Sequence, residues 1–442
     1  MKNAETIMKT LASSGYEAYL VGGCVRDMIM KRPVHDHDIA TNALPNEMIH
    51  IFSGFRVIPT GIEHGTVTVI CNDEPIEVTT YRIDGDYSDG RHPDCVKFTS
   101  EIAGDLSRRD FTMNAIAMSA DGKIIDPFGG CEDIKHKRIR CVGEPDKRFA
   151  EDALRIMRCL RFASTLGFDI DKAAAESVHS LKNTLSLVSR ERICSELNKL
   201  ICGKNAMAVL LDYSDVISEI IPEIKPCIGF CQHSPYHKYD VWEHTVRALS
   251  SASEKNFTVR LALLLHDIGK PSCFSLDENG RGHFKFHGKV GAEIAKAVLK
   301  RLRCDNKTIN CVYLLILHHS DKLHSETDIK HAVSTLGFEL FNMLLDVKEA
   351  DNSAKHSFVL SEVEEIRQMR SIANDIMARG ECLKTSQLAV SGKDLMQLGF
   401  GGREIGKMLK ALLDMVIDGK ISNDKESLTE FAVGRKEKET KI

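Results

Sequence analysis

The spacing of apolar residues changes near residue 146, and this change limits the possible folds more than any other feature of the sequence. Before it, short runs that are rich in β-branched residues and bounded by Gly, Asp or Asn predict strands. These runs cover residues 19–23, 37–43, 66–71 and 75–82. After it, apolar residues recur at the helical period, first over 147–163 and then over 187–202. We therefore predict an α+β fold, in which an N-terminal part with one β-sheet and helices at 2–14 and from Val25 is followed by all-helical parts.

Length and composition are those of an ordinary globular chain. At roughly 150 residues per domain, 442 residues predict about three domains. Breaks in the pattern divide the chain more finely, and we place four parts at 1–145, 146–225, 226–355 and 356–442. A formal charge of −4 argues against a protein that coats nucleic acid through bulk basicity, although it allows a local basic surface.

The cysteines and the apolar runs indicate the compartment. The 14 cysteines are scattered singly, and the closest two in the sequence, Cys227 and Cys231, form no CxxC pair. This pattern predicts reduced thiols in a cytoplasmic protein. No apolar run approaches the roughly 18 residues of a membrane span, and the first residues carry no signal-peptide pattern. We therefore expect neither membrane insertion nor secretion.

Two adjacent glycines mark the first candidate site. Gly22 and Gly23 follow a predicted strand and open a predicted helix. Glycines there let backbone N–H groups approach a phosphate closely, and a helix N-terminus favours an anion. Arg26 adds a bidentate phosphate donor. On its own, this arrangement is weak evidence and is more often a plain tight turn.

A pair of carboxylates follows. Asp36 and Asp38 are separated by one residue, so both project from the same side of the strand expected there, in an otherwise buried setting. Two ionised carboxylates side by side repel each other unless a cation lies between them. The chemistry that uses such a pair is phosphoryl transfer with two Mg²⁺ ions. A third carboxylate usually completes the site: Glu77 is the first candidate, and Asp110, in a helix expected from Arg108, is the second.

Asp152 and Arg155 lie three residues apart on the helix expected at 147–163, so they are neighbours on its surface. An ordinary surface ion pair there contributes little to stability. Next to a phosphoryl-transfer site, however, the pair can choose a base. Cytosine and adenine each offer an amine donor beside a ring-nitrogen acceptor, whereas guanine and uracil offer the reverse and leave buried groups unpaired. Residues 135–163 carry nine Lys or Arg and four Asp or Glu, which favours local RNA phosphate contacts.

The order of these motifs resembles a known family. GGCVRD, DHDIATNA, TTYR, DGRHPD, RRDFTMNAIA and DPFGG follow one another as in the class II tRNA nucleotidyltransferase and bacterial poly(A) polymerase superfamily, and most closely as in CCA-adding enzymes. The resemblance covers 17–202. It implies that Asp36 and Asp38 bind Mg²⁺, that Gly23 and Arg26 contact the triphosphate, and that Arg109 binds the incoming nucleotide. It also implies that Asp152 and Arg155 read the base, that Arg158 and Arg161 support nucleotide binding, and that 189–197 buttresses the neck.

Histidines and aspartates form another set in the third part of the chain. Its members are His244, His266, Asp267, His287, His318, His319 and Asp351. We expect His244 on a helix, the His266–Asp267 pair at the end of an apolar helix, and His287 in a Gly-flanked loop. A buried His-Asp pair needs a cation or a hydrogen-bond network. Imidazole and carboxylate together suit Zn²⁺, Mn²⁺, Fe²⁺ or Ni²⁺.

This set resembles the HD phosphohydrolase superfamily over 237–352. The resemblance implies a primary metal set of His244, His266, Asp267 and Asp351. It also implies that His287, with His318 or His319, binds a second metal or the substrate phosphate, and that the domain hydrolyses 2′,3′-cyclic or monophosphate substrates. An HD fold that has lost catalysis and only braces tRNA is the alternative.

The leading hypothesis is template-independent CCA addition to the tRNA 3′ end from CTP and ATP with Mg²⁺. The four parts are then a catalytic head, a base-reading neck, an HD domain and a tRNA-docking tail, which the segment 388–406 resembles. A poly(A) polymerase and a partial C- or A-adding enzyme are alternatives, and an intact loop at 84–94 favours the full enzyme. An HD phosphohydrolase with a nucleotide-binding head is the rival from another class. Neither a membrane nor DNA is an expected partner, and the oligomeric state is left open.

Overall fold

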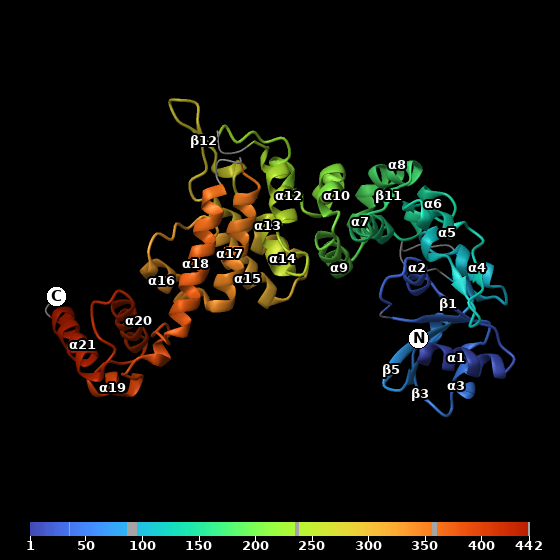
Figure 1. Cartoon of the computed structure of the whole chain (residues 1–442), viewed down its shortest axis with the longest axis horizontal. Coiled ribbons are helices and arrows are strands. Elements are labelled where there is room, and N and C mark those ends of the chain that lie inside the picture. Colours follow the sequence, from blue (N-terminus) through green and yellow to red (C-terminus); the bar gives the residue numbers. More distant parts are fainter. Residues whose placement is uncertain (35, 86–94, 235–237, 356–359, 441–442) are drawn as a thin grey trace. The chain divides into compact units, whose positions relative to one another are not determined.

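The computed structural model describes residues 1–34, 36–85, 95–234, 238–355 and 360–440 (Figure 1). They form two compact units, Met1–Lys225 and Pro226–Ile442, and each is described by itself. The loop expected at 84–94 lies outside the described residues except for its first two positions. No helix in the described ranges is both long and apolar enough to cross a membrane.

A seven-stranded sheet forms the centre of the first unit, with the strand order β3-β4-β5-β2-β1-β8-β9. Its strands are β1 (Ala18–Val21), β2 (Asp38–Thr41), β3 (Arg56–Gly61), β4 (Thr66–Cys71), β5 (Glu74–Thr80), β8 (Ala117–Met118) and β9 (Ile124–Ile125). β1 pairs antiparallel with β2 and β8. β2 and β5 run parallel, and their register places Asp38 opposite Glu77. The predicted strands are confirmed, whereas β3, β8 and β9 had no sequence prediction.

Apolar periodicity explains how helices cover this sheet. In α1 (Lys2–Ser13), Ala4, Ile7, Met8 and Leu11 are buried, which is the spacing of one helix face. α1 contacts β1, β2 and α3 (Pro45–Ile51). Alternate residues of β4 are buried, as expected for a strand covered on one face. Two short pairs lie outside the sheet: β6 (Arg82–Asp84) with β7 (Val96–Phe98), and β10 (Arg138–Ile139) with β11 (Asp169–Ile170).

The helix expected from Arg108 is wrong. The chain instead forms α4 (Ile102–Ser107), an extended stretch and the 3₁₀ turn η2 (Thr112–Asn114). The backbone of this stretch pairs with a distant segment: Thr112 N–H donates to Arg140 O over 2.9 Å, and Val142 N–H donates to Asp110 O over 3.2 Å. Because these groups are used in tertiary pairing, they are not available for helical hydrogen bonds. α2 and α5 both contact η2. These two helices are α2 (Gly23–Ile29) and α5 (Gly130–Lys135).

The rest of the first unit is helical. Its helices are α6 (Pro145–Glu151), α7 (Leu154–Leu166), α8 (Lys172–Leu181), α9 (Arg190–Ile201), α10 (Ala206–Asp212) and α11 (Ser214–Ile220). The continuous helix predicted at 147–163 is therefore wrong, because Asp152 breaks it with an extended backbone (φ −145°, ψ 103°). The Asp152 carboxylate accepts a hydrogen bond from Leu154 N–H at 3.0 Å and so caps α7.

The second unit is also mostly helical. Its helices are α12 (Val241–Ser251), α13 (Phe257–Leu265), α14 (His287–Arg301), α15 (Asn306–His318), α16 (Glu326–Leu336), α17 (Phe338–Ser353), α18 (Leu360–Ala378), α19 (Gly392–Gln397), α20 (Arg403–Ile417) and α21 (Lys425–Thr440). A short hairpin joins β12 (Ser275–Leu276) and β13 (Gly282–His283). One hydrophobic cluster includes Ile329 and Phe341 together with Leu412 and Leu428, so α16 and α17 share a core with the C-terminal helices. Together, the sheet and the helical parts confirm the predicted α+β fold.

Candidate functional site

A cavity of about 570 Å³ in the first unit brings together most residues that the sequence singled out in the head and neck. Its lining consists of Gly22, Gly23, Arg26, Asp36, Asp38, Arg108, Arg109, Asp110, Asn114, Asp152, Arg155, Arg158, Arg161 and Phe162. Glu77 is the one head or neck candidate that is not in this lining. Asn114 and Phe162 were not predicted.

The glycine turn and Arg109 form one wall of this cavity. Gly22 has a φ of +77°, and a Cβ atom there would lie 2.7 Å from Nη1 of Arg109, so only glycine fits. Asp105, fully buried, holds the Arg109 guanidinium through Nη2 at 3.2 Å. Nε of Arg109 is buried and has no hydrogen-bond partner within the described part of the chain. This wall therefore presents an unsatisfied cationic donor beside a tight glycine turn, which suits an anion.

Three acidic candidates of the head are Asp36, Asp38 and Glu77, and their charge is opposite to that of Arg109. Asp36 precedes β2 rather than lying in it, and Asp36 and Asp38 are exposed while His37 between them is buried. The alternation of the strand turns both aspartates outward from a segment whose other residues, among them Ile39 and Ala40, are buried. Glu77, opposite Asp38 on the neighbouring strand, is also exposed.

Neighbouring carboxylates disfavour the charged forms of Asp38 and Glu77. Desolvation raises the pKa of Asp38, which Arg109 partly opposes and Asp36 reinforces. Desolvation, Asp38 and Asp36 together raise the pKa of Glu77. Carboxylates that oppose one another's ionisation are the type of donor that a hard divalent cation such as Mg²⁺ stabilises. The residues present therefore fit a Mg²⁺ site, with Glu77 beside Asp38.

Asp110, the second candidate for a third carboxylate, has different surroundings. Its Oδ2 accepts from Nε of Arg158 at 2.8 Å, and its Oδ1 accepts from the amide of Asn114 at 3.1 Å. Burial raises the pKa of Asp110, but Arg158 and Asn114 more than offset this and hold it well below the usual range. Both oxygens of Asp110 therefore already accept hydrogen bonds, one from Arg158 and the other from Asn114.

Asp152 and Arg155 line the cavity but do not pair with each other, contrary to the helical arrangement expected. The Asp152 carboxylate pairs with Nη2 of Arg192 at 2.7 Å. Arg155 pairs with Glu151 and donates to the main-chain oxygens of Arg148 and Arg108. The partners therefore come from the segment before the helix break and from α9.

Three arginines surround the ring of Phe162. The guanidinium carbons of Arg161, Arg26 and Arg158 lie 3.6, 5.1 and 5.5 Å from its centre. Arg161 also pairs with Glu196 at 2.8 Å. Cation–π contacts of this kind hold arginines in place without consuming their hydrogen-bond donors.

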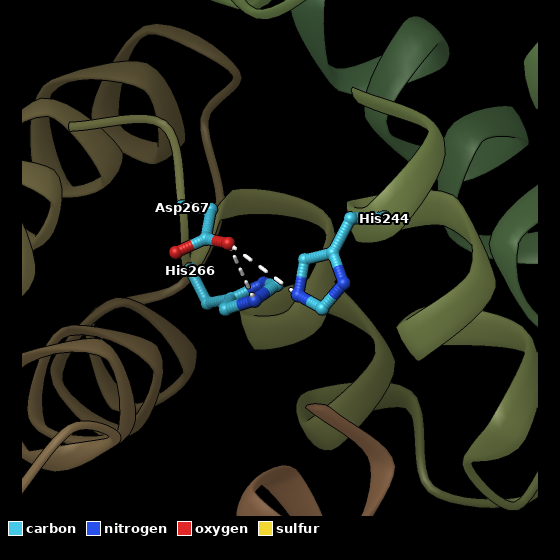
Figure 2. A group of neighbouring side chains, drawn as sticks. All are labelled: His244, His266 and Asp267. Carbon is cyan, nitrogen blue, oxygen red and sulfur yellow. Dashed lines mark ion pairs between the residues drawn. The ribbon is translucent and has the colours of Figure 1, made fainter. Parts of the chain in front are cut away.

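The second candidate site lies in the second unit. His244 on α12 faces His266 and Asp267, which directly follow α13 (Figure 2). Oδ2 of Asp267 lies 3.2 Å from Nε2 of His266 and 3.6 Å from Nε2 of His244. Oδ1 of Asp351, on α17, lies 2.8 Å from Nε2 of His244 and 3.5 Å from Nε2 of His266. The structure thus brings the four predicted primary ligands together.

Of the remaining histidines, His287 and His319 lie beside Asp267, whereas His318 does not. Nε2 of His287 and Nε2 of His319 lie 3.1 Å apart, at 3.6 and 3.9 Å from Oδ1 of Asp267. Asp267 therefore faces His244 and His266 with one oxygen and His287 and His319 with the other. His318 is not in this cluster, because it pairs with Asp321 at 2.7 Å. His287 is also the first residue of α14 rather than part of a loop as expected.

The ring orientations suit a metal ion. Nδ1 of His266, His287 and His319 lies 2.7–2.8 Å from the main-chain oxygen three residues earlier. We assign the proton to Nδ1, since a carbonyl can only accept, and Nε2 then points a lone pair at the cluster. Nε2 of His266 is buried without a hydrogen-bond partner in the described ranges. Imidazole nitrogens and carboxylates of this kind fit Zn²⁺, Mn²⁺, Fe²⁺ or Ni²⁺.

Burial shapes the charge of this cluster. Burial lowers the pKa of His266, but Asp267 and Asp351 override it and raise that pKa to about 10. Burial and the neighbouring His266 lower the pKa of His319 to about 3. Burial and the two aspartates therefore act in opposite directions on the ring of His266.

A cavity of about 680 Å³ opens beside the cluster. Its lining includes Asp267, His287, His319 and Asp351 together with Lys270, Arg281, Lys322, Lys348 and Lys355. Lys270 pairs with Oδ2 of Asp267 at 2.7 Å, and Lys355 pairs with Oδ2 of Asp351 at 3.0 Å. A cation-rich cavity next to a metal-type donor set suits a phosphorylated ligand.

Three family models match separate parts of the chain. The “Poly A polymerase head domain” matches residues 18–140. The “RNA and SrmB- binding site of polymerase A” matches residues 167–228. The “tRNA nucleotidyltransferase domain 2” matches residues 284–432.

Individual proteins are similar over the whole length. The CCA-adding enzyme of Oceanobacillus iheyensis is 34% identical over 437 residues, which covers 97% of this chain and 96% of that protein. The CCA-adding enzyme of Bacillus cereus strain AH187 is 33% identical over 432 residues, which covers 97% of each. Among solved structures, the Bacillus stearothermophilus CCA-adding enzyme in complex with CTP has a TM-score of 0.75 at 30% identity and covers 100% of this chain and 98% of its own. The Thermotoga maritima CCA-adding enzyme complexed with tRNA has the same fold, with a TM-score of 0.58 at 19% identity over 97% of this chain and 93% of that chain.

Proposed function

Because this chain belongs to the class II CCA-adding enzymes, nucleotidyltransferases of the poly(A) polymerase superfamily, we propose that it adds CCA to the 3′ end of tRNA from CTP and ATP. The observation that carries the proposal is the 570 Å³ cavity of the first unit. One space there holds a glycine turn, a pair of aspartates and the Asp152–Arg155 motif, which are the parts needed for a triphosphate, a metal and a base.

The head residues divide the work of phosphoryl transfer. Asp36, Asp38 and Glu77 would hold Mg²⁺, which when bound neutralises phosphate charge and favours ionisation of the attacking hydroxyl. The Gly22–Gly23 turn, Arg26 and Arg109 bind and orient the triphosphate. The tRNA 3′ oxygen forms a bond to the α-phosphorus, the bond from the α-phosphorus to the bridging oxygen breaks, and pyrophosphate leaves.

Asp152 and Arg155 select the base in this proposal. A carboxylate accepts from the exocyclic amine of cytosine or adenine, and a guanidinium donates to the adjacent ring nitrogen. Guanine and uracil would set acceptor against acceptor and donor against donor, which costs several kcal/mol in a buried site and gives large discrimination. Arg192 fixes the Asp152 carboxylate at 2.7 Å and Arg155 is 9% exposed, so both groups are held before a nucleotide arrives. Arg158 and Arg161 support the nucleotide from the same helix.

The test supplies tRNA that ends at the discriminator base with labelled CTP, with labelled ATP, or with both. We expect two cytidines from CTP alone and one further adenosine only after both cytidines are in place. Asp38→Asn is the inactive variant, and Asp146→Asn, an exposed residue with the same change of charge, is its control. Long adenosine tails would identify a poly(A) polymerase, addition of C or A alone a partial enzyme, and no incorporation by the wild type would overturn the proposal.

We also propose that the second unit is an accessory phosphohydrolase of the HD type. The metal would be held by His244, His266, Asp267 and Asp351, and His287 with His319 would hold a second metal or the substrate phosphate. Such a metal supplies an activated water for attack on a phosphoester. The cationic lining of the adjoining cavity supports an anionic substrate, for which a 2′,3′-cyclic nucleotide or a nucleoside monophosphate is proposed. In this account 1–145 is the catalytic head, 146–225 the neck, 226–355 the HD domain and 356–442 the tRNA-docking tail.

The hydrolase proposal has its own test. Release of phosphate or ring opening is measured with 2′,3′-cyclic AMP and with AMP, in Mn²⁺, Ni²⁺, Fe²⁺ or Zn²⁺. We expect His266→Ala to lose hydrolysis and keep CCA addition, and Asp38→Asn to do the reverse. His318→Ala is the matched control, since His318 pairs with Asp321 outside the cluster. Equal hydrolysis by wild type and His266→Ala would contradict the proposal, and so would none from either.

A further inference from the structure

Asn114 lies in the first cavity and links its two sides. It is the last residue of η2, is 5% exposed, and belongs to the cavity lining. The turn that carries it contacts α2, which opens at the glycine turn, whereas its neighbour Asp110 contacts α7 through Arg158. A buried amide in this place must have both of its ends satisfied.

Both ends of the amide are bonded. Oδ1 of Asn114 accepts from Nη1 of Arg26 at 2.7 Å. Nδ2 of Asn114 donates to Oδ1 of Asp110 at 3.1 Å. Oδ2 of Asp110 in turn accepts from Nε of Arg158 at 2.8 Å and pairs with its Nη2 at 2.7 Å. Four side chains therefore form a continuous hydrogen-bonded chain from α2 to α7.

The two arginines at the ends of this hydrogen-bonded series belong to different parts of the proposed nucleotide site. Arg26 follows the Gly22–Gly23 turn and is further fixed by Asp27, whose two oxygens lie 3.0 Å from its Nε and Nη2. Arg158 follows Arg155 by one turn on the base-reading helix. The guanidinium groups of both arginines also lie over the ring of Phe162, so both are in contact with the same side chain. A shift of either arginine is thus transmitted to the other through Asn114 and Asp110.

An asparagine matches this position better than its isosteres. Its oxygen meets a guanidinium and its amino group meets a carboxylate, while the reversed amide would set donor against donor and acceptor against acceptor. Aspartate would keep the bond to Arg26 but place a second carboxylate against Asp110. Leucine has a similar volume and removes both bonds, leaving Arg26 and Asp110 without this partner.

We infer that Asn114 is a positioning residue that couples the triphosphate-side Arg26 to the base-side Arg158, so that the two ends of an incoming nucleotide bind cooperatively. The inference rests on the proposed nucleotidyl transfer, because it assumes that this cavity takes a nucleoside triphosphate. It adds a role that neither arginine has alone. Asn114 acts through Arg26 and Asp110 and is not itself assigned a contact with the nucleotide.

The experiment measures CTP affinity of the full chain by calorimetry in Mg²⁺ without tRNA. Arg26→Lys and Arg158→Lys are made singly and together, first with Asn114 present and then in an Asn114→Leu background. With Asn114 present, we expect the combined loss of affinity to be smaller than the product of the single losses by about three- to tenfold. In the Asn114→Leu background, we expect the losses to multiply. Asn114→Leu alone should weaken CTP binding by about tenfold or more.

Thr112→Val is the matched control. Thr112 lies two residues away, is fully buried and donates to Asp133 at 2.6 Å, but is absent from the cavity lining. Its loss removes a comparable buried hydrogen bond and should leave the coupling between Arg26 and Arg158 intact. Asn114→Asp is the second variant if Asn114→Leu does not fold, and it should also abolish the coupling because it repels Asp110.

Each outcome decides the inference. Coupling that persists without Asn114, that is absent with it, or that disappears equally in Thr112→Val overturns the positioning role. Failure of the proposed function is seen separately, because a wild-type protein that binds CTP and extends no tRNA contradicts the function while the coupling is still measured. A wild-type protein that binds no CTP overturns both.

Discussion

At the scale of single residues, the carboxylates of the head oppose one another until a cation arrives. Asp38 and Glu77 have raised pKa values, mainly because of desolvation, with a further rise from Asp36 in both cases and from Asp38 in the case of Glu77. The folded protein therefore binds protons more readily at these groups than the unfolded chain does. Its stability falls as pH rises through these pKa values, so at neutral pH the carboxylates cost stability in exchange for a metal site.

Asp38→Asn should therefore stabilise the cation-free protein while abolishing nucleotide addition. We expect a higher melting temperature in EDTA, by about 2–4 °C if the relief of repulsion amounts to about 1 kcal/mol. Melting is followed by calorimetry beside the Asp146→Asn control. A lower melting temperature, or retained CCA addition, would contradict the assignment of Asp38 to a metal site.

The pKa of Asp110 is shifted in the opposite direction from those of Asp38 and Glu77. Its pKa is held low by Arg158 and Asn114 against the effect of burial. The stability that this arrangement contributes is fully present above the unfolded pKa of about 4 and is lost as pH falls through the folded value. Asp110→Asn should therefore unfold with a shallower pH dependence below about pH 4. Denaturant melts between pH 2 and 6 test this, and an unchanged slope would count against the Asp110–Arg158 pair.

Most head and neck residues that the sequence singled out line one cavity, but the side-chain partners of these residues were predicted poorly. Motif spacing pointed to the glycine turn and the aspartates, and the family resemblance added the neck arginines Arg158 and Arg161; all of these line the cavity. It did not predict that Asp152 pairs with Arg192, forty positions further along, rather than with Arg155. It also gave no role to Asn114, because a lone asparagine in an apolar run carries no signal until Arg26 and Asp110 are seen beside it.

At the scale of elements, the break between α6 and α7 is the main departure from the sequence prediction. Residues 147–163 have good helix formers and helical periodicity throughout, so local propensity favours a continuous helix. Tertiary contacts decide otherwise, because the Asp152 carboxylate caps α7 and is drawn to Arg192 on α9. The result turns this carboxylate into the cavity instead of along a helix surface.

Two substitutions at Asp152 should distinguish the contribution of its helix-capping hydrogen bond to stability from the contribution of its charge to base selection. Asp152→Ala removes both, and we expect a loss of about 1 kcal/mol in unfolding free energy together with misincorporation of UTP or GTP. Asp152→Asn keeps a capping oxygen, so its stability should stay closer to wild type while base selection is lost. Urea melts and incorporation from each nucleotide separately check this. Unchanged selectivity in both variants would contradict the base-reading role.

At the scale of the whole molecule, the carboxylates that we propose as Mg²⁺ ligands lie in the first compact unit, and the His-Asp groups around Asp267 lie in the second. The sequence indicated both sets, since each follows from the spacing of its own motif. Packing could not be predicted in the same way: helices α16 and α17 share one core with the C-terminal helices, through contacts between residues far apart in the chain. The net charge of −4 is compatible with an RNA enzyme, because many of the site carboxylates are proposed metal ligands and the arginines gather locally.

Metal removal should reveal the two sets separately. Adding Mn²⁺ or Ni²⁺ to EDTA-treated protein is expected to stabilise the second unit by about 2.7 kcal/mol at a hundredfold excess over the dissociation constant. His266→Ala should lose this stabilisation, while Asp38→Asn should keep it. Thermal melts of the three proteins with and without metal provide the measurement. An equal metal response in His266→Ala would place the ion elsewhere.

We propose that one cavity in the first unit builds CCA without a template. The most direct measurement incubates tRNA lacking its terminal CCA with all four nucleotides at equal concentration and sequences the 3′ ends. We expect CCA to dominate the products of the wild type and of His266→Ala, and we expect Asp38→Asn to leave the tRNA unextended. Tails of adenosine, frequent incorporation of U or G, or extension by Asp38→Asn would contradict it.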